Sequence, residues 1–416
     1  MERFSAVGCH VFAGGFTAGV KRVFDVECQL ESHELGHQTV QDVWGVDVHH
    51  SQPRDWPRRM AHHAMLYGNP RCTGFSCVTA GYGSDSHGPW AKQCQDINDL
   101  MEYGLAQDFP VIVWESVQQA FSTGKPLLDL WTERCAKHGK RVAHVLANAC
   151  TFGNSQNRRR YFYIAYPADK QFNVDVPTID PCYRVLGDVI WDRRNNETRE
   201  VKWKTTDYDG DCYLEITPDE KHCIPVLPGG WCLNELGRYG YEHLPEKFQK
   251  MWDRRGSNMP FSMHCVSRLN WLCRSPTLTS TSVRLIHPWH HRPCTIGELA
   301  DIMGWGGRIP VGPLPSLQIA KGVCPDVGEW IAQQVDKCLR DGWGGEEWSC
   351  KFNHKEGKFD GADSRGQLEK VIDITNYHGH SFDIDRFPAE MLRQHHKYNV
   401  NPQTGKLERP WRLKTA

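Results

Sequence analysis

The sequence lacks long apolar runs, an excess of charge of one sign and internal repeats. No segment approaches the roughly 20 apolar residues that a membrane helix needs, and the opening MERFSAVGCHVF lacks a secretory signal pattern. The formal net charge of −1 gives no overall sign of nucleic-acid binding. We therefore expect an intracellular, cytoplasmic protein that has no membrane partner.

Closely spaced cysteines are also missing. The chain has 17 cysteines, and the closest two, Cys72 and Cys77, stand five positions apart. Because no Cys-x-x-Cys pair exists, a zinc ribbon or knuckle is not expected, and we predict no metal site. In a reducing compartment most of these thiols would be small buried side chains, which leaves one or two for chemistry.

Strand-like and helix-like segments alternate through the first third of the chain. The predicted elements are strands at 6–12, 23–31, 64–68, 110–115, 141–149 and 160–166, and helices at 96–106 and 126–139. This alternation predicts an α/β fold with a doubly wound, Rossmann-like sheet. In such a sheet, ligands bind at the carboxyl ends of the strands.

The pattern dissolves between about 167 and 275, where Pro, Gly, Asp, Trp and Arg are frequent. It returns with 275–280, 294–305 and one long helix at 317–339, whereas 340–416 is charged and His-rich with few apolar positions. A chain of 416 residues should form two or three lobes.

Positive charge gathers in a few stretches despite the low net charge. These stretches are 156–160, 191–204 and 252–257. They fit either a surface that follows phosphates or solvated loops.

A Gly-rich turn follows the first strand. The stretch FAGGFTAG contains Phe12, Ala13, Gly14 and Gly15, and such a turn lets the backbone approach a nucleotide-like ligand closely. Glu31 ends the next strand, where a carboxylate can accept both hydroxyls of a ribose. A plain turn and a solvated strand end are the simpler alternatives.

Reactive groups stand at the ends of the central strands. The stretch GNPRCTGFSC places Cys72 in a turn directly after a strand, and VIVWES places Glu115 at the end of the neighbouring strand. Gln156, Arg158 and Arg160 occupy alternate positions and so share one face. Thiol, acid and hydrogen-bond donors would then converge over a pyrimidine and its phosphate. A solvent-facing acid and a charged edge strand are the alternatives.

The order of these motifs resembles that of the DNA cytosine-C5 methyltransferase family over about residues 1–339. The family's motifs are a Phe-x-Gly-x-Gly-Gly turn, a Gly-x-Pro-Pro-Cys-x-Gly-Phe-Ser loop, Glu-Asn-Val, Gln-x-Arg-x-Arg, Arg-x-x-Thr-x-x-Glu and Gln-x-Gly-Asn-Ala-Val. The matching residues, in the same order, are Phe12, Gly14 and Gly15; Gly68, Pro70, Cys72, Gly74, Phe75 and Ser76; Glu115, Ser116 and Val117; Gln156, Arg158 and Arg160; Arg292, Thr295 and Glu298; and QIAKGV at 318–323.

The resemblance implies a class I S-adenosylmethionine-dependent methyltransferase fold and cytosine-C5 chemistry on a base flipped out of duplex DNA. It implies that Cys72 adds to C6 of the ring, and that Glu115 contacts or protonates N3. Arg160 would hold the O2 side, and Arg158 would fix the loop or a phosphate. The residues expected to contact DNA are Gln156, Ser76 and Arg292.

The resemblance also implies S-adenosyl-L-methionine as the donor. The residues expected around it are Phe12, Ala13, Gly14, Gly15, Glu31, Pro70, Arg71, Lys321 and Val323, with Asp55 as the candidate for the adenine contact. Donor binding and catalysis would occupy 1–166 and 281–339, target recognition 167–280, and 340–416 would be an extension of unknown role. We expect a monomer that acts on double-stranded DNA.

Three departures from the family cluster around the donor. The Gly-rich turn is about two residues short, Arg71 replaces the second proline of Pro-Pro-Cys, and Lys321 replaces the asparagine of the closing motif. Two cations beside a sulfonium are unfavourable, because like charges about 4 Å apart cost roughly 4 kcal/mol at an effective dielectric near 20.

A donor with a carboxylate on the transferred carbon, carboxy-S-adenosyl-L-methionine, would instead pair with these cations. The hypothesis that follows is carboxymethyl transfer, giving 5-carboxymethylcytosine. The alternative is ordinary methyl transfer, with Lys321 turned to solvent or paired with an acid and Arg71 on a DNA phosphate.

Three rival interpretations come from other classes. An RNA cytosine-C5 methyltransferase would use similar chemistry, although the long lobe at 167–275 favours duplex DNA. A catalytically inactive DNA-binding protein would need none of Cys72, Glu115 and Arg160. A nicotinamide-dependent dehydrogenase would share the Gly-rich turn but gives no reason for the Cys72 loop.

Overall fold

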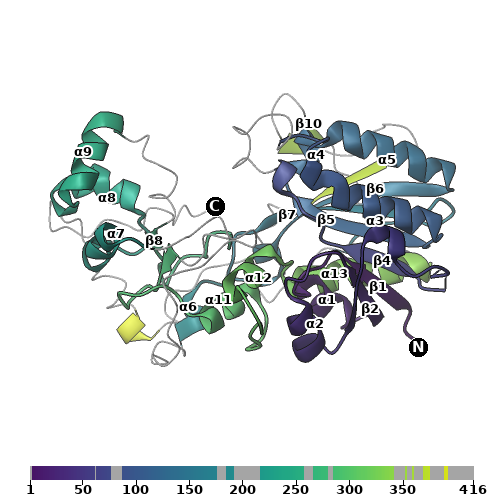
Figure 1. Cartoon of the computed structure of the whole chain (residues 1–416), viewed down its shortest axis with the longest axis horizontal. Helices are drawn as coiled ribbons and strands as arrows, with labels where there is room; N and C mark the ends of the chain where they lie inside the picture. The colour runs from purple at the N-terminus through teal and green to yellow at the C-terminus, as the bar shows by residue number, and fades with distance from the viewer. Residues whose placement is uncertain are drawn as a thin grey trace.

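The structure is a computed structural model that describes residues 2–60, 62–75, 87–175, 184–191, 216–256, 266–279, 284–341, 352–353, 358–359, 369–374 and 388–391. Among these residues, a large lobe is built on an eight-stranded sheet, and a smaller, mainly helical lobe lies beside it (Figure 1). No helix in the described part of the chain combines the length and the apolar character that crossing a bilayer requires.

The sheet has the strand order β12-β6-β7-β5-β4-β1-β2-β3. The strands are β1 (Ser5–Cys9), β2 (Asp25–Glu31), β3 (Asp47–His50), β4 (Met65–Gly68), β5 (Val111–Val117), β6 (Lys140–Asn148), β7 (Arg159–Pro167) and β12 (Glu369–Asp373). All neighbours pair in parallel except β7, which runs antiparallel between β5 and β6. The strand order reverses between β1 and β4, where doubly wound sheets bind ligands. The predicted fold class is confirmed.

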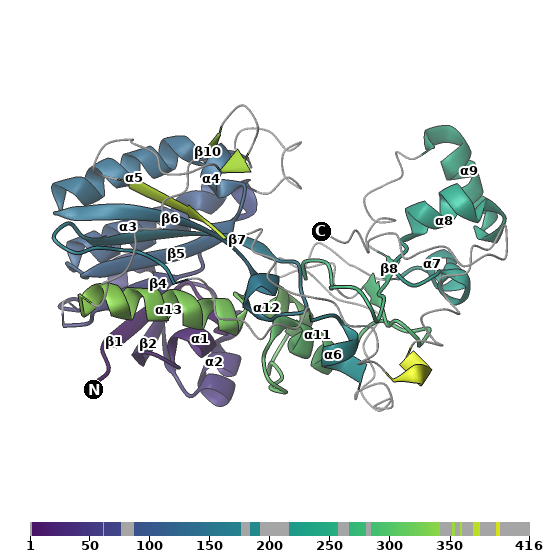
Figure 2. The ribbon, with the colours of Figure 1, turned by 180° about the vertical axis from the view of Figure 1, so that it is seen from behind.

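Different helices cover the two faces of the sheet, because successive strand residues point to opposite faces. Ala6 and Met65 belong to an apolar core shared with the first, second and thirteenth helices, whereas Val7 and Leu66 belong to a core shared with the third and fifth. These helices are α1 (Gly15–Val20), α2 (His37–Trp44), α3 (Gln95–Ala106), α5 (Lys125–Lys137) and α13 (Pro325–Leu339). Figure 2 shows α1, α2 and α13 on one side and α3 and α5, with the short α4 (Ala120–Thr123), on the other.

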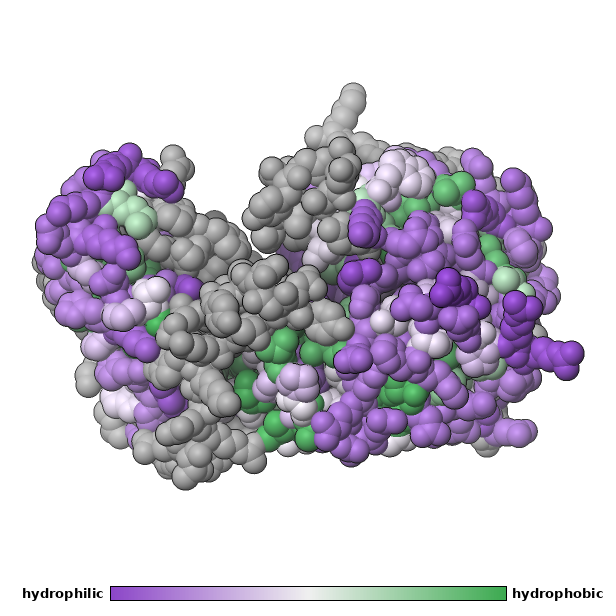
Figure 3. Space-filling model, viewed as in Figure 1, coloured by the Kyte–Doolittle hydropathy of each residue, from purple (hydrophilic) through white to green (hydrophobic). Residues whose placement is uncertain are grey.

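The smaller lobe has a separate apolar core around Leu227. Its elements are α7 (Pro218–Cys223), α8 (Leu233–Tyr239), α9 (Glu246–Arg255), β8 (Ser267–Arg268) and β9 (Leu285–Ile286). The buried Arg268 donates to the carbonyls of Ile224, Leu227 and His287. A buried arginine can thus satisfy carbonyls that irregular loops leave unpaired. The described residues of this lobe present a mainly hydrophilic surface in Figure 3.

Three short helices lie between the sheet and the helices of the smaller lobe (Figure 1). They are α6 (Gly187–Ile190), α11 (Ile296–Met303) and α12 (Pro315–Lys321). Residues of all three belong to the same apolar core as the α13 face of the sheet. The sheet and the link to the smaller lobe therefore share one core.

The single long helix expected at 317–339 is wrong. The structure has two helices there, because Gly322 is extended after α12 (φ −79°, ψ 169°) and Pro325 opens α13. The break brings the carbonyl oxygen of Val323 within 2.6 Å of the place that a Cβ on Gly15 would occupy. The end of α12 therefore reaches the Gly-rich turn through a contact that only glycine allows.

The C-terminal segment contributes to the sheet and to the apolar core that the sheet shares with α6. β12 pairs with β6 at one edge of the sheet, and Met391 is buried where it would touch a Cβ on Gly187 of α6. A short antiparallel pair, β10 (Phe352–Asn353) and β11 (Lys358–Phe359), also lies in this segment. An extension with few apolar positions thus still adds an edge strand.

Candidate active site

The ends of β4 and β5 bring an acid next to a loop. These strands are parallel neighbours, and a Cβ on Gly68, the last residue of β4, would lie 2.5 Å from the carbonyl oxygen of Cys9. Asn69 follows and donates a hydrogen bond to the carboxylate of Glu115 on β5. Pro70 is buried behind it. The loop after β4 is therefore fixed beside Glu115 from its first residue.

Cys72 lies in this loop, directly before η2 (Thr73–Phe75), as a partly exposed free thiol. The backbone N–H of Val117, at the end of β5, donates to its sulfur. Burial raises the pKa of Cys72 and Glu115 raises it further, whereas Arg160 lowers it. The structure brings the thiol, the acid and the arginine together at one end of the sheet, as expected.

Glu115 is almost fully buried and forms an ion pair with Arg160, with Nε and Oε1 2.7 Å apart. Arg160 stands on β7, opposite Val117 of β5. Burial raises the pKa of Glu115, although Arg160 and the hydrogen bond from Asn69 oppose this shift. A carboxyl group that keeps its proton at a higher pH than usual can donate that proton to a ring nitrogen.

The side chains of Gln156 and Arg158 lie deeper than that of Arg160. Arg158 donates to the carbonyls of Leu278, Ala320 and Gly322, each at 2.8 Å, and burial lowers its pKa to about 10. Gln156 is fully buried, and its Oε1 accepts from the backbone N–H of Leu278. These two side chains join β7 to the segments around 278 and 321. The structure gives no surface access to Gln156, which we expected to contact DNA.

The Gly-rich turn is packed so tightly that it leaves no room for a side chain at Gly14. Gly14 has a left-handed backbone (φ 77°) at the start of α1, and a Cβ there would lie 2.8 Å from the ring of Trp44. The Trp44 indole N–H donates to the carbonyl of Ala13 at 2.8 Å. Phe12 is also left-handed (φ 54°) and buried. The shortened turn is thus held in one shape by contacts with α2.

Glu31, at the end of β2, is fully buried beside this turn. Its Oε1 accepts hydrogen bonds from the backbone N–H groups of Val11 and Phe12 and from the Gln29 amide. Its Oε2 is buried without a hydrogen-bond partner among the described residues. Burial raises the pKa of Glu31 to about 8. Because buried oxygens are normally paired, Oε2 fits hydroxyls supplied by a ligand such as a nucleoside.

The positive charges of Lys321 and Arg71 have different neighbours. Lys321 ends α12, and its Nζ lies 5.2 Å from the centre of the Phe12 ring, over the Gly-rich turn. Arg71 forms a two-pronged ion pair with Asp96, at 2.8 and 2.9 Å. Burial would raise the pKa of Asp96, but hydrogen bonds from His33 and Arg71 hold it below the usual range. The expectation that Arg71 adds an uncompensated cation is therefore wrong.

Three other expected contacts are placed as follows. Asp55, in η1 (Pro53–Asp55), is exposed and pairs with the adjacent Arg54 at 3.5 Å. Arg292 makes two 2.9 Å bonds to Glu298, which also completes the N-terminal cap of α11 with Thr295. Ser76 lies outside the described residues. In this structure, Arg292 thus stabilises the start of α11.

Sequence reasoning missed two residues of the site. Asn69 stands between Gly68 and Pro70, so its position next to the Cys72 loop was the signal available. Asp96 opens α3 and gives no signal in the sequence, because its role depends on a contact with Arg71 across the loop. It fixes the guanidinium group directly before the thiol.

Comparisons with known proteins agree with this geometry. A family profile described as C-5 cytosine-specific DNA methylase matches residues 7–305. The Type II methyltransferase M.DdeI of Desulfomicrobium norvegicum is 24% identical over 255 residues, which span 58% of this chain and 58% of that protein. The chain thus matches less than two thirds of the length of this relative.

Two solved structures share the fold. One is an E. coli protein described as a candidate DNA modification methyltransferase encoded within a prophage, with a TM-score of 0.55 and 17% identity over 81% of this chain and 99% of that one. The other is the Entamoeba histolytica methyltransferase EhMeth, with a TM-score of 0.53 and 9% identity over 82% and 99% of the two chains. At these identities the likeness concerns the fold alone.

Arg158 and Arg160 should differ in what they do for stability. Arg158→Met leaves the carbonyls of Leu278, Ala320 and Gly322 without their donor, and each unpaired buried group costs about 1–3 kcal/mol. We expect the free energy of unfolding to fall by roughly 3 kcal/mol or more, measured by urea denaturation. Arg160→Met is the control and should cost less, because Glu115 keeps its Asn69 contact and can take up a proton. Equal losses would contradict this division.

Proposed function

The chain belongs to the C-5 cytosine-specific DNA methylase family, and we propose on this basis that it transfers an alkyl group from a sulfonium donor to C5 of cytosine in duplex DNA. The observation that carries the proposal is the meeting of Cys72, Glu115 and Arg160 at the carboxyl end of the central strands. A nucleophile, a proton donor and a fixed cation are the groups that activation of a pyrimidine ring needs.

The residues divide the chemistry among them. The Cys72 sulfur adds to C6 of the ring, which makes C5 a nucleophile. Glu115 gives a proton to N3, so the ring accepts the electron pair without developing a full negative charge. Arg160 orients Glu115 and stands next to the O2 side of the ring. C5 then forms a bond to the carbon carried by the sulfonium, which leaves as a neutral thioether. Loss of the C5 proton to a base expels the Cys72 sulfur, and N3 returns its proton to Glu115, so the aromatic ring is restored.

The raised pKa values of Cys72 and Glu115 fit these roles. Burial raises the pKa of Glu115, which favours the protonated form that can give a proton to N3. Burial likewise raises the pKa of Cys72, which favours the thiol over the more reactive thiolate, whereas Arg160 and the Val117 N–H favour the thiolate. The cytosine must leave the duplex before it can reach this sulfur.

The donor would lie between the Gly-rich turn and Glu31. The unpaired Oε2 of Glu31 would accept the ribose hydroxyls, and Phe12, Gly14 and Gly15 would shape the turn around the nucleoside. When bound, the sulfonium donor supplies an electrophilic carbon. Duplex recognition would fall to the smaller lobe, which carries exposed arginines such as Arg254 at the end of α9.

The finer proposal concerns the group that is transferred. Lys321 lies over Phe12, whose backbone N–H is bonded to Glu31, so position 321 places a cation beside the donor turn. A donor with a carboxylate on the transferred carbon would pair with this ammonium group. We therefore favour carboxy-S-adenosyl-L-methionine and the product 5-carboxymethylcytosine. Arg71 does not support the carboxymethyl proposal, because the Asp96 carboxylate already pairs with its guanidinium group.

Methyl transfer from S-adenosyl-L-methionine is the second candidate. It is favoured by the same Lys321 contact, because an ammonium group over the Phe12 ring already has a partner. The two candidates share the C5 chemistry and differ only in the donor.

The shared chemistry is tested by the nucleosides it produces. Duplex DNA is incubated with the full chain and each donor in turn, digested, and examined by mass spectrometry. We expect a C5-alkylated cytidine that is lost by more than about a hundredfold in Cys72→Ala, because the nucleophile is gone. Cys232→Ala, a partly exposed thiol in the smaller lobe, is the matched control and should keep the activity. Product formed on tRNA but not on duplex DNA would favour an RNA substrate instead.

Lys321→Asn tests the donor. If the ammonium group pairs with the donor carboxylate, this change should shift the ratio of carboxymethyl to methyl product toward methyl by at least about tenfold, or roughly 1.4 kcal/mol. Lys92→Asn, at an exposed lysine, controls for loss of charge. An unchanged ratio would overturn the carboxymethyl proposal and leave cytosine-C5 transfer standing.

Donor binding should weaken as the pH falls below about 8. The pKa of Glu31 is raised to about 8 by burial, and ribose hydroxyls bind the ionised carboxylate best, so binding displaces a proton below that pH. We expect the Kd for S-adenosyl-L-homocysteine to rise by up to about tenfold per pH unit below pH 8 and to level off above it, measured by calorimetry. Glu31→Gln should bind more weakly and without this dependence. A wild-type Kd that does not change between pH 6 and about pH 8 would contradict this role for Glu31.

A further inference from the structure

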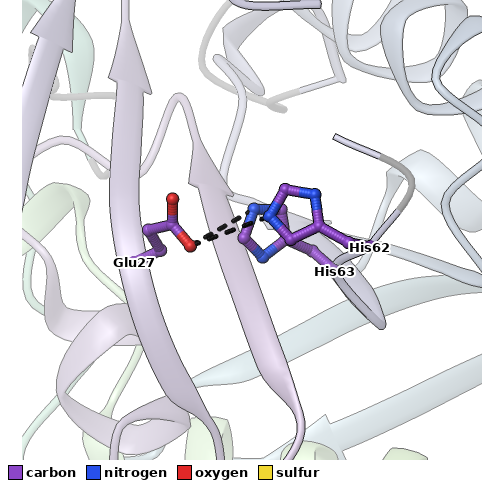
Figure 4. Close-up of side chains that lie close together, drawn as sticks. All are labelled: Glu27, His62 and His63. Atoms are coloured by element: carbon purple, nitrogen blue, oxygen red, sulfur yellow. Dashed lines mark ion pairs between the residues drawn. The ribbon is translucent and has the colours of Figure 1, made fainter. Parts of the chain in front are cut away.

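Two imidazoles and a carboxylate gather at the end of the sheet opposite to Cys72. Glu27 lies on β2, and His62 and His63 directly precede β4. Figure 4 shows the three side chains pointing toward one another. Ser5 begins β1, the strand between β2 and β4. This cluster lies at the amino ends of these parallel strands, so it takes no part in the chemistry proposed above.

The spacing of the three side chains suits one metal ion. One ligand atom from each lies within 4.8 Å of the other two. Oε2 of Glu27 is 3.4 Å from Nε2 of His63 and 4.0 Å from Nε2 of His62. Around tetrahedral zinc, with ligands at about 2.0–2.1 Å, neighbouring ligand atoms stand roughly 3.3 Å apart. The Glu27–His63 pair has this spacing, and the Glu27–His62 pair is wider and involves an exposed imidazole.

His63 is held in the orientation that a ligand requires. Its ring is fully buried, and its Nδ1 lies 3.0 Å from the Ser5 hydroxyl. Its Nε2 is also buried and has no hydrogen-bond partner among the described residues. When Nδ1–H donates to Ser5, Nε2 turns a lone pair toward the carboxylate of Glu27. Two electron-rich atoms then face each other 3.4 Å apart, an arrangement that a metal ion between them would stabilise.

The ligand types select the metal. Two imidazole nitrogens and one carboxylate oxygen suit zinc and similar transition metals, whereas magnesium and calcium prefer oxygen ligands alone. Glu27 and His62 are largely exposed, which leaves access for a fourth ligand from solvent. A metal held here would connect β2 to the entry of β4, the strand whose other end carries the Cys72 loop.

We propose that Glu27, His62 and His63 form a zinc site that stabilises the amino end of the sheet. The spacing of the cysteines predicts no metal site. That spacing is not informative about this site, because none of the proposed ligands is a thiol. The site would bind the folded chain better than the unfolded chain and would raise its melting temperature accordingly.

Zinc binding by the full chain tests the proposal. Protein stripped with a chelator is titrated with Zn²⁺ in a calorimeter, and its Tm is followed with and without the ion. We expect one tight site per chain and a rise in Tm of a few degrees. His62→Ala and Glu27→Gln, both at exposed positions that the fold tolerates, should each weaken binding by about tenfold or more and remove the rise in Tm.

Two controls separate this site from the many thiols. His138→Ala removes an exposed imidazole elsewhere and should leave binding unchanged. Co²⁺ in place of Zn²⁺ should show the visible bands of a tetrahedral nitrogen and oxygen site without thiolate charge-transfer absorption. Absence of tight binding, unchanged binding in His62→Ala and Glu27→Gln, or a thiolate signature would each overturn the proposal. The first result would mean that a proton on His63 meets the Glu27 carboxylate instead.

Discussion

A carboxylate buried at the end of a strand cannot remain without partners, and the partners of Glu115 organise the proposed active site. Its oxygens are met by Arg160 from β7 and by Asn69 from the loop after β4. These contacts tie together two strands and the segment that carries Cys72. Removing Arg160 would favour the protonated form of Glu115, because the arginine is what most opposes the rise in its pKa on burial. The position of the thiol and the raised pKa of Glu115 both follow from this arrangement.

A second set of contacts brings the late part of the chain to the early part. Arg158 donates to carbonyls at 278, 320 and 322, and the close approach of Val323 to Gly15 needs the absence of a side chain on the glycine. Both depend on the break between α12 and α13. Lys321, the last residue of α12, lies over Phe12, and the proposed choice of donor depends on that contact.

Much of this could be read from the sequence, and the failures have physical reasons. The central strands are apolar on both faces, and residues after parallel strands must meet at one edge, so Cys72 and Glu115 could be placed together. The break after Lys321 was hidden, because apolar positions continue at a helical spacing through it. β12 was missed because EKVID is a charged edge strand, and β3, with the sequence DVHH, resembles a loop. The charge of Arg71 is visible in the sequence, but its compensation by Asp96 is not, since pairing depends on the folded loop. The same holds for Glu27 and His63, which the fold alone brings together.

The most direct test of the account is whether the Cys72 sulfur bonds to a cytosine in DNA. Fluorine at C5 cannot leave as a proton does, so a duplex with 5-fluorocytosine at its target sites should hold the enzyme as a stable adduct once the donor has reacted. The account predicts a DNA-linked peptide whose attachment maps to Cys72 by mass spectrometry, and none with Cys72→Ala. A complex that dissociates on denaturation, or an adduct through another residue, would contradict it.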